Sequence, residues 1–190
     1  MSHVDLKPIA TENSVRGRND FFEVLRIRRS VRAFENRPVE QEKLEKILAA
    51  ANSAPSAGNL QGYEIVVIRE ETTRRSLVSA TYNQAFIAQA PVYLLFCANP
   101  ARSEVKYGKE GGALFSLEDA TIACAYAELA TAALGLGTVW IGALDLPKVV
   151  QLTGIPAEWR PVALLPIGYR GEAPASTSRR PLSDIVHDPI

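Results

Sequence analysis

The sequence predicts an α+β sandwich in which a small central sheet is covered by helices. Three observations lead to this fold class: apolar runs of strand length, segments with the apolar spacing of a helix, and an excess of helices over strands along 190 residues. The length and the hydrophobic share of 47% suit one soluble domain. With no repeat and no linker, we divide the chain into an N-terminal arm or tail over residues 1–18 and a single domain over residues 19–190.

The first third of the chain predicts two helices and a strand. Asn19 or Asp20 can cap a helix with apolar residues from Phe21 onward. A second helix follows Pro38 and ends before Pro55, because proline lacks an amide donor and disfavours helix in the residue before it. Its apolar residues have helical spacing: Leu44, Ile47, Leu48 and Ala51. A polar turn then leads to a strand over 63–68 that is rich in β-branched residues.

The rest of the chain alternates helices and strands. Residues 99–115 contain proline, adjacent glycines and mixed charge, which predicts mostly loop. The segment Ser116 to Asp119 has the form of a capping box, so we expect an alanine-rich helix from there to the stop signal at Gly135. The other predicted elements are helices over 71–80 and 83–90, strands over 92–98, 138–143 and 162–168, and a short helix opened by Asp145 and Pro147.

Composition excludes several function classes. Lys plus Arg equals Asp plus Glu, 21 each, so no global field would attract nucleic acid or an anionic membrane. The two cysteines lie in apolar runs and are expected in the core. The two histidines lie near the chain ends, which disfavours a zinc site and a histidine-assisted nucleophile. We find no signal peptide and no membrane-spanning stretch, and expect a cytoplasmic protein.

The most informative stretch is a cluster of arginines after the first helix. Arg28, Arg29 and Arg32, with Ser30 between them, present planar donor forks that match phosphate or carboxylate oxygens. A plain surface charge cluster is the alternative for this stretch alone. No dinucleotide or triphosphate glycine loop is present, and no nucleophile with a base. Anion-binding groups without reactive side chains indicate that a bound cofactor carries the chemistry.

Four stretches together resemble the FMN-dependent nitroreductase family, in its order and spacing. The resemblance runs from about Phe21 to about Val186. It rests on the sequences RRSVR at 28–32, PSAGNLQ at 55–61, GLGTVWIGA at 135–143, and IGY at 167–169 with RRPL at 179–182. Each stretch alone has an ordinary structural explanation, such as a turn, a helix stop or a solvated pair of arginines.

The resemblance implies a nitroreductase-like sandwich with a small antiparallel-type sheet, and a homodimer with two FMN sites at the subunit interface. By this match Arg28 and Ser30 hold the phosphate and ribityl end, Arg32 lies near flavin N1, and a turn from the partner borders the flavin. No catalytic side chain and no metal ligand is implied. The candidate cofactor-binding residues are Arg28, Arg29, Ser30, Arg32, Pro55, Ser56, Asn59, Gln61, Gly142, Ala143, Arg179 and Arg180.

The chain departs from the common family pattern at two places. Ala57 stands where many members have a serine hydroxyl, and Gly62-Tyr63 replace a Pro-Trp pair. One cofactor hydrogen bond, worth about 0.5–1.5 kcal/mol, would be lost. The stretch between Asn99 and Leu114 is shorter than in the longer members of the family, which place helices there over the substrate site. This shortness predicts an open substrate pocket.

The resemblance implies an oxidoreductase that passes hydride from NADH or NADPH through FMN to a nitroaromatic, quinone or similar small-molecule acceptor in a ping-pong cycle. Two alternatives stay open: a sister reaction on the same fold, such as reductive dehalogenation or flavin-consuming chemistry, and a non-catalytic flavin-binding module. A nucleic-acid binder is the weakest alternative, because no basic face accompanies the arginine cluster.

Overall fold

The computed structural model describes residues 21–187, and the expected arm over 1–18 and the cap at Asn19 or Asp20 lie outside them. The helices are α1 (Phe21–Ile27), α2 (Gln41–Asn52), α3 (Glu71–Leu77), α4 (Pro100–Ala133) and α5 (Leu146–Thr153), and the 3-10 turns are η1 (Ala57–Asn59), η2 (Val78–Ala80), η3 (Ala85–Gln89) and η4 (Leu182–Asp184). The strands are β1 (Tyr63–Ile68), β2 (Val92–Ala98), β3 (Gly137–Thr138) and β4 (Arg160–Gly168). They form an antiparallel sheet in the order β1-β2-β4-β3. This confirms the predicted α+β class.

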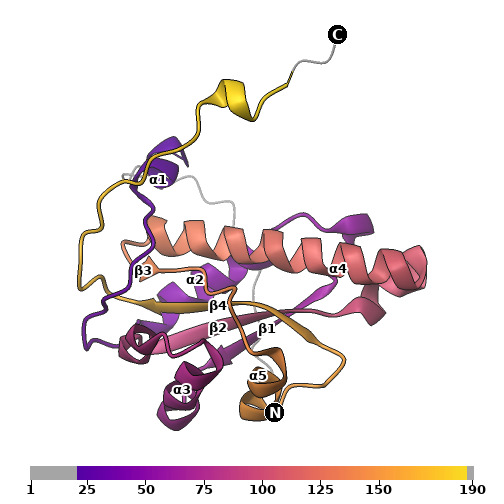
Figure 1. Cartoon of the computed structure of the whole chain (residues 1–190), viewed down its shortest axis with the longest axis horizontal. Helices are drawn as coiled ribbons and strands as arrows, with labels where there is room; N and C mark the ends of the chain where they lie inside the picture. Colours follow the sequence, from indigo (N-terminus) through magenta and orange to yellow (C-terminus); the bar gives the residue numbers. More distant parts are fainter. Residues whose placement is uncertain (1–20, 188–190) are drawn as a thin grey trace.

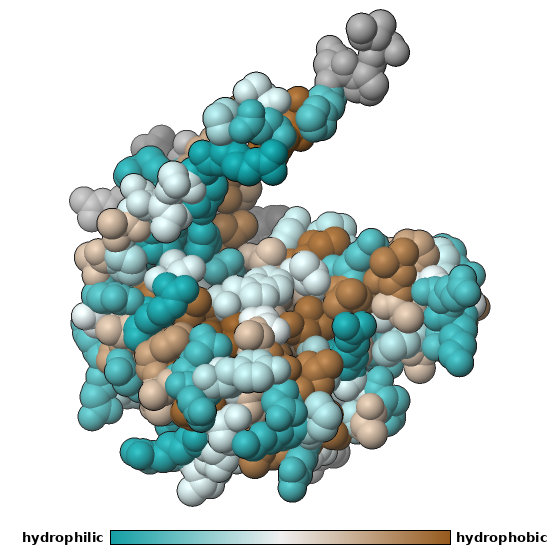
Figure 2. All heavy atoms as spheres, viewed as in Figure 1, coloured by the Kyte–Doolittle hydropathy of each residue, from teal (hydrophilic) through white to brown (hydrophobic). Residues whose placement is uncertain are grey.

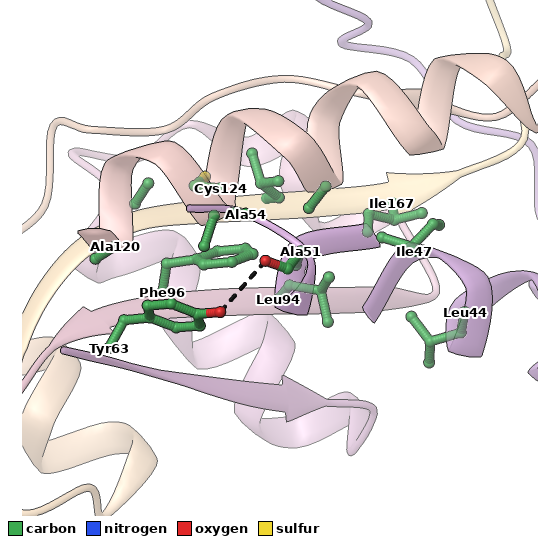
Figure 3. Packing of buried hydrophobic residues seen from close by; sticks show 14 of the residues in the cluster. Leu44, Ile47, Ala51, Ala54, Tyr63, Leu94, Phe96, Ala120, Cys124 and Ile167 are labelled. Carbon is green, nitrogen blue, oxygen red and sulfur yellow. Dashed lines mark hydrogen bonds between the residues drawn. The ribbon is translucent and has the colours of Figure 1, made fainter. Parts of the chain in front are cut away.

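Helices cover both faces of the sheet (Figure 1). Strand β2 is buried along its whole length, so its side chains alternate between two cores. Leu94 and Phe96 pack with α2 and α4 on one face, as Figure 3 shows for this cluster. Tyr93 and Leu95 pack with residues of α3 and α5 on the other face. Both cysteines are buried, as expected from their apolar surroundings.

Local sequence signals predicted several elements well. Strands β1 and β2 have the expected bounds, and Leu44, Ile47 and Ala51 of α2 are buried. Gly135 adopts a φ of 75° directly after α4, as a helix stop requires. The Asp145 side chain accepts a hydrogen bond from the Lys148 amide at 3.2 Å, which caps α5.

The strand expected over 138–143 is shorter than predicted. It consists of Gly137–Thr138, after which only Ile141 pairs with β4, through Leu164. The helices expected over 71–80 and 83–90 are also cut short. Tyr82 and Asn83 both have positive φ, and this break leaves α3 followed by short 3-10 turns.

The prediction of a loop over 99–115 was wrong, because α4 begins at Pro100. Pro100 occupies the first helical turn, where a missing amide donor costs nothing. The chain bends at Gly108, whose φ of 67° and ψ of −178° divide α4 into two limbs. A Cβ on Gly112 would lie 2.3 Å from the Glu104 side chain. The glycines that suggested a loop are therefore needed for close packing of the two limbs.

The prediction of a capping box at Ser116 was also wrong. Ser116 and Asp119 lie inside α4 and are buried. The Asp119 carboxylate accepts from two amides of a different segment, at Ala57 and Gly62, with distances of 2.8 and 3.0 Å. The Asp119 side chain therefore binds the backbone of a turn that is distant in sequence. The local sequence pattern could not predict this role. Among residues 21–187, we found no helix with the length and apolarity needed to cross a bilayer.

Candidate functional site

The arginine cluster and the C-terminal segment together enclose a cavity of about 340 Å³, which we call the arginine cavity. Its lining residues come from two stretches that are far apart in sequence: Arg28, Arg29, Ser30, Arg32, Pro174, Ala175, Ser176, Thr177 and Arg179. The structure therefore unites five of the predicted cofactor residues in one place. Guanidinium and hydroxyl groups dominate the polar part of this lining, which suits an anion such as a phosphate.

The backbone of the arginine cluster is fixed to the edge of the sheet. The Val31 amide donates to the Thr138 carbonyl at 3.0 Å, and Ser30 pairs with Thr138 in a parallel bridge. Val31 and Phe34 point into the core and are buried. Because side chains alternate along extended chain, burying Val31 turns Ser30 and Arg32 outward. This register places their polar groups at the cavity.

Arg28 is paired with a carboxylate that was not among the residues predicted from the sequence. Its Nη1 lies 3.3 Å from Oε1 of Glu128 in α4, and the two side chains are 24% and 15% exposed. Burial raises the pKa of Glu128, and the Arg28 charge acts in the opposite direction. The pair holds the Arg28 guanidinium against α4. The only signal in the sequence is that Glu128 is the one acidic residue in the apolar stretch 120–134.

The other arginines differ in how free their guanidinium groups are. Arg29 Nη1 donates to the Arg26 and Arg28 carbonyls at 2.6 and 2.7 Å, which folds it back toward the C-terminal end of α1. Arg179 Nη1 donates to Thr177 Oγ1 at 2.6 Å, within its own loop. Across residues 21–187 no side-chain partner occurs for the Arg32 guanidinium, which is exposed. Arg32 is thus the cation most available to a ligand.

The C-terminal arm, residues 171–187, leaves the end of β4 and passes the arginine cluster (Figure 1). Its first contacts hold it there: the Gly171 amide donates to the Ala33 carbonyl at 2.8 Å, and Glu172 accepts from the Arg32 amide. A Cβ on Gly171 would lie 3.1 Å from the Ala33 backbone. Arg180 is absent from the cavity lining and donates to the Asp184 carbonyl at 2.5 Å.

The predicted residues Pro55, Ser56, Asn59 and Gln61 form a compact turn with an internal network. The Gln61 amide and side chain both donate to Ser56 Oγ, at 3.1 and 3.2 Å, and the side chain also reaches Asn59 Oδ1 at 2.8 Å. Asn59 and Gln61 have φ values of 58° and 45°, which non-glycine residues rarely adopt. Pro55 and Asn59 are exposed. The turn is therefore a preformed polar surface.

This turn does not reach the arginine cavity of its own chain. It is bonded to Asp119 of α4, whereas Arg28 is bonded to Glu128. Those two acidic residues are nine positions apart on one helix, or about 13 Å along its axis at 1.5 Å per residue. In Figure 1 the turn lies toward the end of α4 opposite to α1. One copy of the chain thus separates the predicted site into two parts.

Gly142 and Ala143 are exposed on the irregular segment between β3 and α5. Within the described part of the chain neither backbone amide donates a hydrogen bond. A Cβ on Gly142 would meet only the Trp140 side chain, at 3.2 Å. Both residues lie on a segment that continues from Thr138, which pairs with Ser30.

A second cavity, of about 590 Å³, contains Arg37, Arg74 and Arg75. These cations are already engaged. Arg75 pairs with Glu71 and Arg37 with Glu40, while Arg74 donates to the Ala90 carbonyl at 2.5 Å. The arginine cavity, whose Arg32 guanidinium has no side-chain partner within residues 21–187, is the better anion site.

Comparison with known proteins identifies the family of the chain. The model of the family described as "Nitroreductase family" matches residues 25–82 and 73–169, which is most of the chain. The chain belongs to the nitroreductase family. This family member is 32% identical to a protein of Bacillus subtilis named FMN reductase [NAD(P)H], over 89% of this chain and 73% of that protein. It is 31% identical to the oxygen-insensitive NADPH nitroreductase of Salmonella typhimurium, over 84% of this chain and 70% of that protein.

The fold of this nitroreductase-family chain is also found among solved structures. The NADPH:FMN oxidoreductase from Vibrio harveyi, solved in complex with NAD+, superposes with a TM-score of 0.82 and 27% identity. The superposition covers 90% of this chain and 77% of that one. The predicted family and fold class are therefore confirmed.

Proposed function

We propose that this protein is an NAD(P)H-dependent flavin oxidoreductase that uses FMN to reduce a nitroaromatic, quinone or similar small acceptor in ping-pong order. The observation that carries the proposal is the arginine cavity, whose lining includes four arginines from two distant segments. Its relatives in Bacillus, Salmonella and Vibrio are named as an NAD(P)H-dependent FMN reductase, an NADPH nitroreductase and an NADPH:FMN oxidoreductase, which supports flavin-dependent chemistry. Bound FMN supplies the two-electron chemistry for which no side chain here is suited.

The residues of the arginine cavity fit the phosphate end of FMN. A phosphate monoester carries about −1.5 to −2 charge near neutral pH and accepts several hydrogen bonds. Arg28, Ser30 and Arg179 provide donors of matching type. Arg28 already has the Glu128 carboxylate as a partner, so its charge is partly balanced without a ligand. Arg32, which is exposed and has no side-chain partner within residues 21–187, supplies the additional positive charge that an anionic cofactor needs.

Gly142 and Ala143 are proposed to donate backbone hydrogen bonds to the cofactor. Both residues are exposed, and neither amide has a hydrogen-bond partner within residues 21–187. Gly142 lies four positions after Thr138, which an extended chain would span over about 13 Å. A long cofactor anchored at Ser30 can therefore extend along this segment toward the free amides. The protein's part in catalysis is to orient the reactants and provide fixed electrostatics.

We further propose that the working unit is a homodimer. Phe21 and Phe22 of α1 and Leu182 of the C-terminal arm are exposed, the last two by 72% and 73%. Both elements project from the body (Figure 1), and hydrophobic side chains also gather on the face over α4 (Figure 2). A second copy would bury these groups. It would also bring the turn over 55–61 to the arginine cavity of its partner, which completes the site.

The absorption spectrum of the purified protein tests the proposed function. We expect a yellow protein, or a colourless one that turns yellow after incubation with FMN. Its visible absorption should bleach anaerobically with NADH or NADPH and return when a nitroaromatic or quinone is added. Binding of FMN without bleaching by either nucleotide would favour a non-catalytic flavin-binding module. Absence of FMN binding would rule out the proposed function.

Arg32→Ala should release FMN and slow turnover without unfolding the protein. Its guanidinium is exposed and has no side-chain partner within the described chain, so its loss should leave the melting temperature unchanged. A charge-assisted hydrogen bond contributes about 1.5–3 kcal/mol, which corresponds to a roughly ten- to hundredfold weaker affinity. Fluorescence titration with FMN measures the change. Arg37→Ala, in the second cavity, is the matched control that should bind FMN normally.

A further inference from the structure

The turn over 55–61 depends on α4 for its shape. Three of its residues, Gly58, Asn59 and Gln61, have φ between 45° and 58°. Non-glycine residues in this region persist only when the surrounding structure holds them there. The bonds within the turn connect its side chains to each other, but they do not fix the turn to the protein body. That anchoring comes from three groups near α4.

Asp119 is the central anchor. Both of its carboxylate oxygens are used, one by the Ala57 amide at 2.8 Å and the other by the Gly62 amide at 3.0 Å. The first amide lies inside the turn, and the second directly follows its last residue. Asp119 is only 2% exposed, so water does not compete for its oxygens. A buried carboxylate that accepts from two amides forms strong, directional bonds.

Two further contacts close the anchor. Arg102 Nε donates to the Gln61 carbonyl at 2.8 Å, and the Asn99 amide donates to the Gly62 carbonyl at 2.8 Å. Gly62 allows this approach, since a Cβ there would lie 2.5 Å from Ser103 Oγ and 3.1 Å from the Ser116 backbone. The absence of a side chain at residue 62, a departure from the common family pattern, is thus a requirement of this particular packing.

We infer that Asp119 is a positioning residue that acts across the dimer interface: it holds the turn of one copy in the shape that binds the cofactor in the arginine cavity of the other. The inference rests on the proposed FMN-binding homodimer. Asp119 faces away from its own arginine cavity, because its carboxylate is occupied by the turn about 13 Å along α4 from the Arg28 contact. Its effect on a cofactor must therefore pass through the turn.

Asp119→Asn is the informative variant because it keeps the size of the side chain and replaces one acceptor by a donor. We expect FMN affinity to fall about tenfold or more, since an unfixed turn must be ordered on binding. We also expect the visible absorption band of the bound flavin to shift. Tyr93→Phe is the matched control: it removes a buried hydroxyl that donates to the Ile87 carbonyl at 2.7 Å on the opposite face of the sheet. It should lower stability without changing FMN affinity or the flavin spectrum.

Mixed dimers decide whether the effect crosses the interface. One copy carries Asp119→Asn, the other carries Arg32→Ala, and the two are co-expressed with different tags. If the turn serves the partner, the mixed dimer has one site with both defects and one site with neither. We expect one FMN of wild-type affinity and spectrum per mixed dimer, and weak binding in both parent homodimers. If the turn served its own chain, every site would carry one defect, and the absence of a wild-type site would overturn the inference.

The remaining outcomes are also distinguishable. An Asp119→Asn homodimer with wild-type FMN affinity and spectrum would overturn the inference while leaving the proposed function intact. A wild-type protein that binds no FMN would remove the proposed function itself. Should Asp119→Asn fail to fold, Arg102→Ala replaces it in both experiments, because that side chain is exposed and holds the same turn. Arg102→Ala should also weaken FMN binding, and unchanged binding would overturn the inference.

Discussion

Arg28→Ala is expected to lose both stability and FMN affinity. Removing the guanidinium leaves the Glu128 carboxylate without its partner in a mostly buried position. Breaking a fully buried pair costs about 3–5 kcal/mol, and we expect about 1–3 kcal/mol here because both side chains keep some exposure. The lost phosphate donor should weaken FMN binding by a further ten- to hundredfold, roughly.

The stability loss should grow with pH. Burial already raises the pKa of Glu128, and without Arg28 the opposing influence disappears, so the folded-state pKa rises further. Between the unfolded and folded pKa values the folded protein binds more protons, and its stability therefore falls as the pH rises through this window. Urea unfolding at about pH 5 and about pH 8 should show a larger loss at the higher pH.

A double variant separates the two roles of Arg28. Glu128→Gln in the Arg28→Ala background removes the buried charge, so it should recover most of the stability and abolish the pH dependence. It should not restore FMN binding, because the phosphate donor is still missing. Wild-type FMN affinity in Arg28→Ala would exclude Arg28 from the site.

Truncation after Gly171 should abolish FMN binding while leaving a folded body. The removed residues include Arg179 and four other lining residues of the arginine cavity, and those that the structure describes, 172–187, are almost all exposed. Few contacts tie the arm to the body, so we expect little change in the unfolding temperature of the truncated chain. Loss of Arg179 and of the cavity wall should weaken FMN binding by at least about a hundredfold.

Arg179→Ala is the control for the truncation. It removes one charge and keeps the wall formed by residues 174–177. We expect roughly a tenfold weaker affinity, clearly less than the truncation produces. Equal effects of the two variants would mean that the arm contributes only its arginine. Circular dichroism and fluorescence titration provide both measurements.

The fold was accessible from the sequence wherever a local pattern determined the structure. The apolar spacing of Leu44, Ile47 and Ala51 identified the buried face of α2, and the β-branched run of β1 identified a strand. Gly135 identified a helix end. In each case the signal comes from the same few residues that form the element.

Prediction failed where contacts between separate segments of the chain decided the structure. Gly111 and Gly112 suggested a loop, yet they lie in α4, where Gly112 packs against Glu104. Asp119 had the form of a helix cap, yet its partners are amides more than fifty positions earlier in the chain. Glu128 lies in an otherwise apolar stretch of α4, and its pairing with Arg28 depends on how α1 meets α4.

The sequence alone determined the family, the fold class and the residue types that could bind an anionic cofactor, because these depend on short motifs and on periodicity. The tertiary structure decided which candidates meet. It brought Arg28, Arg32 and Arg179 into one cavity and kept the turn over 55–61 apart from them. The physical reason is that a side chain's partners are set by helix packing and strand register, and both bring together residues that are far apart in the chain.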